Sequence, residues 1–253
     1  MIVSVAQAQL FFLALTRIMA MTINIPVLGG KNIPNQVRIG LGLLLALVLV
    51  PWQPLPASTA AIGFFGFAVA IGKEALIGTL TGFAASLTFG AIQIAAEVLE
   101  LGSGFASGHV LNPSMGNSGS AYNQLFVILS TLYFLVIDGH HMVLIAMERT
   151  FQVIPINGSL PFNSLEVLMQ MTSQLIASGI QLALPIMVAV FLTDMTLGLL
   201  ARVAPQVQVY ILGLPLKVGV SLIAMGLLFT IILPHLADLY QSIGDRMLLL
   251  IVR

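Results

Sequence analysis

Long apolar stretches constrain this chain more than any other feature of its sequence. An α-helix needs about 20 mainly apolar residues to cross the hydrocarbon core of a bilayer. Windows of about that length recur between turn-forming or charged residues, although the second is short and the third is long enough for a bent helix. The six regions are Gln9–Leu28, Val37–Val50, Ile62–Ala96, Leu125–Met147, Leu175–Leu197 and Val209–Leu233. They predict an all-α membrane protein with about six apolar helical regions.

The scarcity of charged residues supports this interpretation. Of the 253 residues, 58% are hydrophobic and 7% are charged, whereas soluble domains carry roughly 25% charged residues. A water-soluble surface cannot be built from so few charges. The net charge is zero and no basic block occurs, so membrane lipid is a predicted partner and nucleic acid is not. The chain has no cysteine, which excludes thiol chemistry.

Prolines and small residues indicate how the apolar regions are arranged. Pro185 and Pro215 fall inside or at the edge of apolar windows, where a missing N–H breaks a helix, so we expect bent helical hairpins. The third region also carries small residues at intervals of four, which let another helix approach closely. That helix belongs either to this chain or to another. The small residues are Gly78, Gly82, Ser86 and Gly90.

Several charged residues lie within or at the ends of the apolar regions. Each costs about 2.5 kcal/mol or more if it faces lipid, so we expect them to be paired, hydrated or kept away from lipid, at a subunit interface or in a wet lumen. Glu97 and Glu100 share one helical face and either repel each other there or mark a helix end at the membrane surface. The candidate assembly or lumen charges are Arg17, Arg38, Glu74, Glu97, Glu100, Asp194, Arg202 and Lys217.

One uncharged segment, Gly102–Gln124, interrupts the apolar regions. Of its 23 residues, 14 are Gly, Ser, Asn or Pro, and none is Asp, Glu, Lys or Arg. Long loops are usually functional elements or solvated linkers, and linkers normally carry charge. A deformable pore closure or re-entrant loop fits this composition, and a plain extramembrane connection is the alternative. The candidate plug residues are Gly102, Gly104, Phe105, Gly108, His109, Asn112, Pro113, Met115, Gly116 and Gly119.

Spacing disfavours enzymatic interpretations of this segment, although distance alone does not exclude His235 as a base for Ser118, and a rhomboid-type protease stays the least favoured alternative. The sequence from Gly116 to Gly119 resembles the Gly-x-Ser-Gly of rhomboid-type intramembrane serine proteases, but along a continuous helix His140 and His141 lie about 33 Å from Ser118. The histidines do not form a metal-binding pattern, so neither a metal nor a cofactor is predicted. The chain is therefore not expected to be an enzyme.

An ordered series of motifs resembles the FliR family of the flagellar type III export gate, which includes virulence-secretion homologues. The resemblance covers nearly the whole chain. The matching residues are Arg17, Pro26, Pro34 and Arg38; Glu74, Gly78 and Gly82; Gly104, Phe105 and Ala106; Asn112 and Pro113; Gly139 and His140; Leu184, Pro185, Asp194, Gly198, Arg202, Ala204, Pro205 and Gln206; and Gly213, Pro215 and Lys217.

The resemblance implies a non-enzymatic subunit of a protein-conducting channel for unfolded export substrates. It implies assembly with FliP and FliQ, association with FlhB and FlhA, and a place in the bacterial inner membrane at the flagellar basal body. One membrane domain, 1–253, would comprise a FliP-like part, 1–166, and a FliQ-like part, 167–253. The loop 102–124 would help to plug the closed pore.

A small-solute secondary transporter is the alternative from another class. Such a transporter would share apolar spans, broken helices and buried carboxylates with a gate subunit. It would also have an internal repeat, and the second half of this sequence does not repeat the first convincingly.

Overall fold

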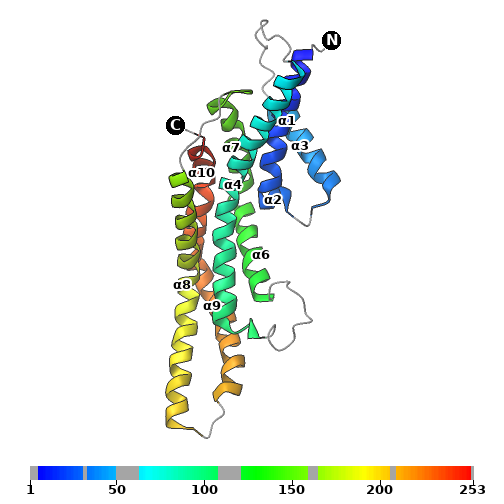
Figure 1. The fold of residues 1–253 in the computed structure, drawn as a ribbon. Helices are drawn as coiled ribbons and strands as arrows, with labels where there is room; N and C mark the ends of the chain where they lie inside the picture. The colour runs from blue at the N-terminus through cyan, green and yellow to red at the C-terminus, as the bar shows by residue number, and fades with distance from the viewer. Residues whose placement is uncertain are drawn as a thin grey trace. The chain divides into compact units, whose positions relative to one another are not determined.

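The computed structural model describes residues 5–30, 33–49, 63–107, 121–158, 165–205 and 209–251, and within those ranges its regular structure is helical. This confirms the predicted all-α class (Figure 1). The helices are α1 (Val5–Asn24), α2 (Pro26–Gly29), α3 (Asn35–Leu49), α4 (Phe64–Ser103), α6 (Ala121–Val136), α7 (Gly139–Val153), α8 (Leu165–Val203), α9 (Val209–Gln241) and α10 (Ile243–Leu249).

Each predicted apolar region overlaps at least one helix, but the helices differ in length from the predicted regions. Four stretches are long and apolar enough to cross a membrane: Val5–Asn24, Phe64–Ser103, Glu166–Val203 and Leu212–Leu249. A fifth span is obtained if the bent pair of α6 and α7 counts as one. The second region forms only the 15-residue α3, which is shorter than a bilayer requires. At 40 residues, α4 extends for about 60 Å and exceeds the bilayer core.

Proline does not interrupt the long helices, contrary to the sequence-based expectation. The helix α8 continues through Pro185, and α9 continues through Pro215 and Pro234. A proline removes one backbone donor, and a helix of more than 30 residues retains its remaining hydrogen bonds on both sides. Pro26, in contrast, begins the short α2 directly after α1 ends.

The chain folds into two compact units, and each draws on separate parts of the sequence. The first unit comprises Met1–Phe89, Asp138–Thr172 and Gln241–Arg253. The second comprises Gly90–Ile137 and Ser173–Tyr240. The division into parts 1–166 and 167–253 concerns likeness to other proteins and stays a prediction.

Small residues bring the helices into close contact inside each unit. In the first unit, a Cβ added to Gly78 would lie 2.7 Å from Ala20 Cβ and against the Arg17 carbonyl. In the second unit, a Cβ added to Gly179 would lie 2.7 Å from the Ala91 carbonyl oxygen. Within the small-residue stripe, Gly78 and Gly82 therefore pack against α1 of this same chain, whereas Gly90 faces Leu175 of α8.

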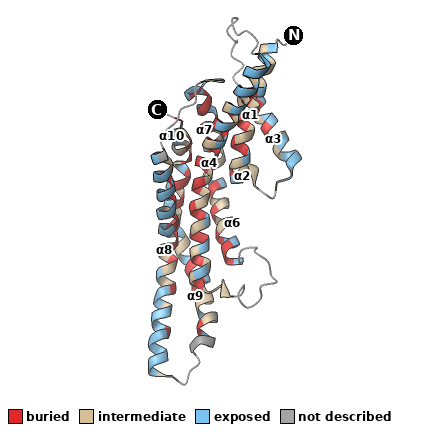
Figure 2. Ribbon diagram, viewed as in Figure 1, coloured by how far each residue is buried: buried red, intermediate tan, exposed pale blue. Residues whose placement is uncertain are grey.

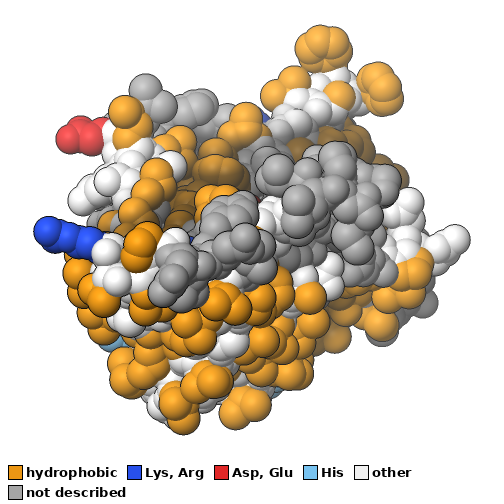
Figure 3. All heavy atoms as spheres, turned by 90° about the horizontal axis from the view of Figure 1, so that it is seen from below, with side chains coloured by type: hydrophobic (Ala, Val, Ile, Leu, Met, Phe, Trp, Pro, Cys, Tyr) orange, Lys and Arg blue, Asp and Glu red, His pale blue; other side chains and the backbone are white. Residues whose placement is uncertain are grey.

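Many large apolar side chains remain exposed, as expected for a chain surrounded by lipid or partner subunits. Exposed residues are prominent along α8 (Figure 2). Hydrophobic side chains also cover much of the face seen in Figure 3, and the charged ones visible there lie near its edge. Exposed examples on α8 are Val188, Phe191, Leu192, Met195 and Leu199.

Candidate functional site

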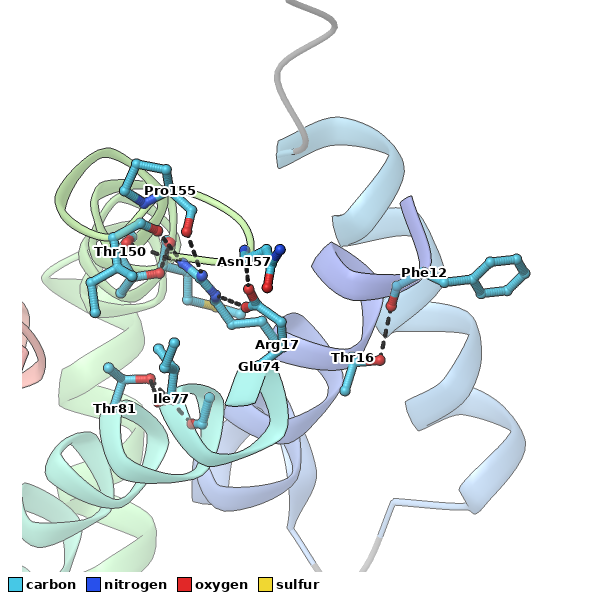
Figure 4. A network of polar contacts seen from close by, with 12 residues as sticks. Phe12, Thr16, Arg17, Glu74, Ile77, Thr81, Thr150, Pro155 and Asn157 are labelled. Atoms are coloured by element: carbon cyan, nitrogen blue, oxygen red, sulfur yellow. Dashed lines mark hydrogen bonds and ion pairs between the residues drawn. The ribbon is translucent and has the colours of Figure 1, made fainter. Parts of the chain in front are cut away.

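A buried ion pair forms the polar centre of the first unit (Figure 4). Arg17 on α1 donates from Nε to Glu74 Oε2 on α4 at 2.5 Å, and both side chains are 0% exposed. The guanidinium also donates from Nη1 to the carbonyl oxygen of Thr150 at 3.2 Å and to that of Ile154 at 2.7 Å. Arg17 therefore joins α1 to α4 and to the C-terminal end of α7.

The turn after α7 completes this cluster. Arg17 Nη2 donates to the Pro155 carbonyl at 3.4 Å, and the Asn157 N–H donates to Glu74 Oε1 at 2.7 Å. The guanidinium carbon lies 4.5 Å from the centre of the Phe151 ring. A helix leaves its last carbonyls unpaired and carries partial negative charge at that end, so a cation is favourable there. Arg17 thus acts as a C-terminal cap of α7 supplied by another helix.

The last residues of α4 form the start of the uncharged segment, Gly102–Gln124. The helix ends at Ser103, and Gly104 follows with a φ of 85°, which favours glycine. The Ala106 N–H donates to the Glu100 carbonyl at 3.4 Å and closes the turn. A Cβ added to Gly104 would lie 3.3 Å from Leu214 Cδ2, so this turn rests against α9.

An aromatic contact joins the two described ends of the segment. The rings of Phe105 and Tyr122 have centroids 5.0 Å apart and planes tilted by 31°. The Tyr122 hydroxyl donates to the Ser221 carbonyl on α9 at 3.2 Å. Residues that were predicted for the plug but lie outside the described residues are Gly108, His109, Asn112, Pro113, Met115, Gly116 and Gly119.

A second ion pair lies in the second unit. Lys217 Nζ on α9 is 2.9 Å from Asp194 Oδ1 on α8, and the side chains are 20% and 47% exposed. Arg202, near the end of α8, is exposed and forms no ion pair within the described part of the chain. The structure thus brings together Lys217 and Asp194, but not Arg202.

The remaining predicted charges occupy different surroundings. Arg38 is half-buried and donates from Nη2 to the carbonyls of Gly30 at 3.1 Å and Ile33 at 3.4 Å. Glu97 is exposed on α4 and accepts a hydrogen bond from Gln93 at 3.3 Å. Glu100 is half-buried one turn further on. Glu97 lies inside the long α4, whereas Glu100 lies in its last turn, since the helix ends at Ser103.

Sequence reasoning missed the partners that surround Arg17. Asn157 adopts a φ of 61° in the turn after Pro155, and the Asn-Gly pair at positions 157 and 158 is a turn signal that was available in the sequence. The carbonyls of Thr150 and Ile154 give no such signal, because every residue has one. No group of three His, Cys, Asp or Glu side chains suited to a metal ion occurs among the described residues.

The helical fold, the apolar spans and the two ion pairs together define a multi-span all-α membrane protein. The sequence model described as "Bacterial export proteins, family 1" matches residues 8–243, so the chain belongs to that family, which confirms the resemblance to FliR proteins.

Three curated relatives illustrate the range of the family. The flagellar biosynthetic protein FliR of Pectobacterium carotovorum subsp. carotovorum is 31% identical, over 93% of this chain and 90% of the relative. FliR of Escherichia coli strain K12 is 29% identical over the same shares. The Yop proteins translocation protein T of Yersinia pestis is 26% identical over 95% of this chain and 94% of the relative. The similarity thus extends beyond flagellar proteins.

Proposed function

We propose that this chain is a non-enzymatic core subunit of a flagellar type III export gate. In this proposal it forms, with FliP and FliQ and in association with FlhB and FlhA, a gated channel for unfolded substrates in the bacterial inner membrane at the flagellar basal body. The observation that carries the proposal is the family match over residues 8–243, together with FliR relatives covered over about nine-tenths of their length.

The chemistry of the uncharged segment supports a plug within that gate. A closure over a channel for variable polypeptides must seal against ions without binding one particular side chain. Small residues make such a segment deformable, and a few apolar side chains can anchor it. The segment 102–124 has this composition, and Phe105 and Tyr122 hold its two described ends together. We therefore assign the plug role to the residues between these two anchors.

Deleting residues 108–118 is expected to leave assembly with FliP and FliQ largely intact and to raise passive ion flux. The deletion retains Gly104, Phe105 and Tyr122, so the contacts that the segment makes with α9 remain. The flux is measured in vesicles that contain the assembled complex. A deletion of the same length at residues 51–61, which are also uncharged, is the matched control. An assembled deletion complex that stays tightly sealed contradicts the plug role.

We further propose that Asp194, Arg202 and Lys217 support assembly with the sister subunits. Asp194→Asn is expected to reduce co-purification with FliP and FliQ, because it leaves the Lys217 ammonium unpaired on an otherwise apolar surface. The paired exchange of Asp194→Lys and Lys217→Asp keeps both charges and should restore co-purification. Charge-removing variants that stop export but co-purify normally would exclude the assembly role.

A further inference from the structure

The helix α1 carries a buried charge that a helix of its length cannot place in water. It has 20 residues and is about 30 Å long, which just matches the hydrocarbon core of a bilayer. Arg17 lies seven residues before the end of α1 at Asn24, and its side chain is 0% exposed. If α1 shifted along the membrane normal to hydrate Arg17, only residues 5–16, about 18 Å of helix, would remain in the core.

The helix α4, which carries Glu74, has no such restriction. It has 40 residues and is about 60 Å long, roughly twice the thickness of the bilayer core. The stretch 75–103 alone extends for about 43 Å, so α4 can cross a membrane with Glu74 inside or outside the core. Of the four stretches that could cross, α1 is also the least apolar. The helix α4 can therefore cross by itself, whereas α1 needs its charge neutralised.

The acceptors around the Arg17 guanidinium all come from later parts of the chain. Glu74 is 57 positions further on, and the carbonyls of Thr150 and Ile154 are 133 and 137 positions further on. Of these acceptors only Glu74 carries a full negative charge, and a hydrogen bond between two ionised groups is stronger than one to a neutral carbonyl. Gly78 on the same helix lets the backbone of Arg17 approach closely. The counter-charge thus lies on the helix that packs closely against α1.

We propose that Glu74 is the positioning residue that allows α1 to cross the membrane, so that α1 and α4 cross as a pair that shares one ion pair. An unpaired arginine near the middle of a span shifts the balance against crossing about a hundredfold. The proposal concerns how the chain is placed in the membrane, so it goes beyond the proposed gate function and does not depend on it. It also requires no change of conformation in the folded protein.

The test is cysteine labelling in isolated membranes, because the chain has no cysteine of its own. Phe12→Cys introduces a thiol on α1 at a site where the native side chain is 54% exposed. Val188→Cys introduces one on α8, where the native side chain is 53% exposed, and serves as the matched control. A membrane-impermeant maleimide, added to both faces of the membrane, labels a thiol only where water reaches it. Each thiol is tested in the full-length chain with Glu74→Met, with Arg17→Met and with both substitutions.

We expect Glu74→Met to raise the ratio of labelled to unlabelled chain at position 12 about a hundredfold and to leave labelling at position 188 unchanged. Arg17→Met and the double variant should keep position 12 unlabelled, because α1 then carries no charge. Arg17→Met breaks the same ion pair, so it separates the placement of α1 from a general loss of stability.

Four results would overturn the inference. Labelling of position 12 without any substitution at Arg17 or Glu74 would show that α1 does not cross the membrane. An unlabelled position 12 in Glu74→Met would show that α1 crosses without its counter-charge. Equal labelling of position 12 in Glu74→Met and Arg17→Met would indicate general unfolding. Labelling of position 188 in Glu74→Met would show that the effect is not confined to α1.

Discussion

Replacing Arg17 with alanine is expected to lower the free energy of unfolding by about 3–5 kcal/mol. The change leaves the Glu74 carboxylate buried without its cation, and it removes the donor to the Ile154 carbonyl after α7. The Pro155 carbonyl keeps its hydrogen bond from the Gly158 N–H. Removing one partner of a buried pair costs far more than the pair contributes. The midpoint of thermal unfolding of the detergent-solubilised complex measures this loss.

Arg38 provides the matched control for Arg17. It also donates to two backbone carbonyls, but within the described residues it is only half-buried and has no carboxylate partner. Arg38→Ala should therefore cost about 1 kcal/mol. The double variant Arg17→Met with Glu74→Met should recover part of the loss, because no unpaired charge remains buried. Equal losses for Arg17→Ala and Arg38→Ala would show that burial of the ion pair is unimportant.

Alanine substitutions at Gly78 and Gly72 are expected to change stability in opposite directions, although both glycines lie in α4. At Gly78 the new Cβ would meet the Arg17 carbonyl and lie 2.7 Å from Ala20 Cβ, so α1 must move away. Such overpacking costs about 1–3 kcal/mol. At Gly72 nothing lies within 4 Å of the added Cβ, and alanine should stabilise the helix by roughly 0.5–1 kcal/mol.

The Gly78 variant also tests whether close packing of α1 on α4 supports the ion pair between Arg17 and Glu74. Because the added Cβ at Gly78 presses on the backbone of Arg17 itself, Gly78→Ala should also weaken the pair with Glu74. Its effect should therefore be less than additive with that of Arg17→Ala in the double variant, since contacting residues share their interactions. Thermal unfolding of the unsubstituted protein, Gly78→Ala, Arg17→Ala and the double variant measures this coupling. A Gly78→Ala protein as stable as the Gly72→Ala protein would contradict close packing of α1 on α4.

The helices were the most predictable part of this chain. Apolar runs of about 20 residues have few alternatives to a helix in a membrane, because backbone groups must be satisfied within the segment. The effect of proline was less predictable: α8 and α9 continue through Pro185, Pro215 and Pro234. Whether a proline breaks a long helix depends on the helices packed around it. These helices come from distant parts of the sequence, so the residues beside the proline do not predict the outcome.

The candidate site was predictable in its charged residues and less so in its contacts. Arg17, Glu74, Asp194 and Lys217 stand out because each lies in an apolar stretch. Nothing in the spacing shows that Arg17 pairs with Glu74, which is 57 residues away. Tyr122 was not among the predicted plug residues, and its hydrogen bond to Ser221 spans 99 residues.

The sequence by itself determined the helical class, the approximate spans, the family and the unusual uncharged segment, because all four depend on local composition or ordered motifs. Only the tertiary structure decided that Arg17 caps α7 and that Tyr122 reaches α9. The physical reason is that the acceptors in both contacts are backbone carbonyls. Every residue carries such an acceptor, so its identity becomes apparent only when packing brings a donor to it.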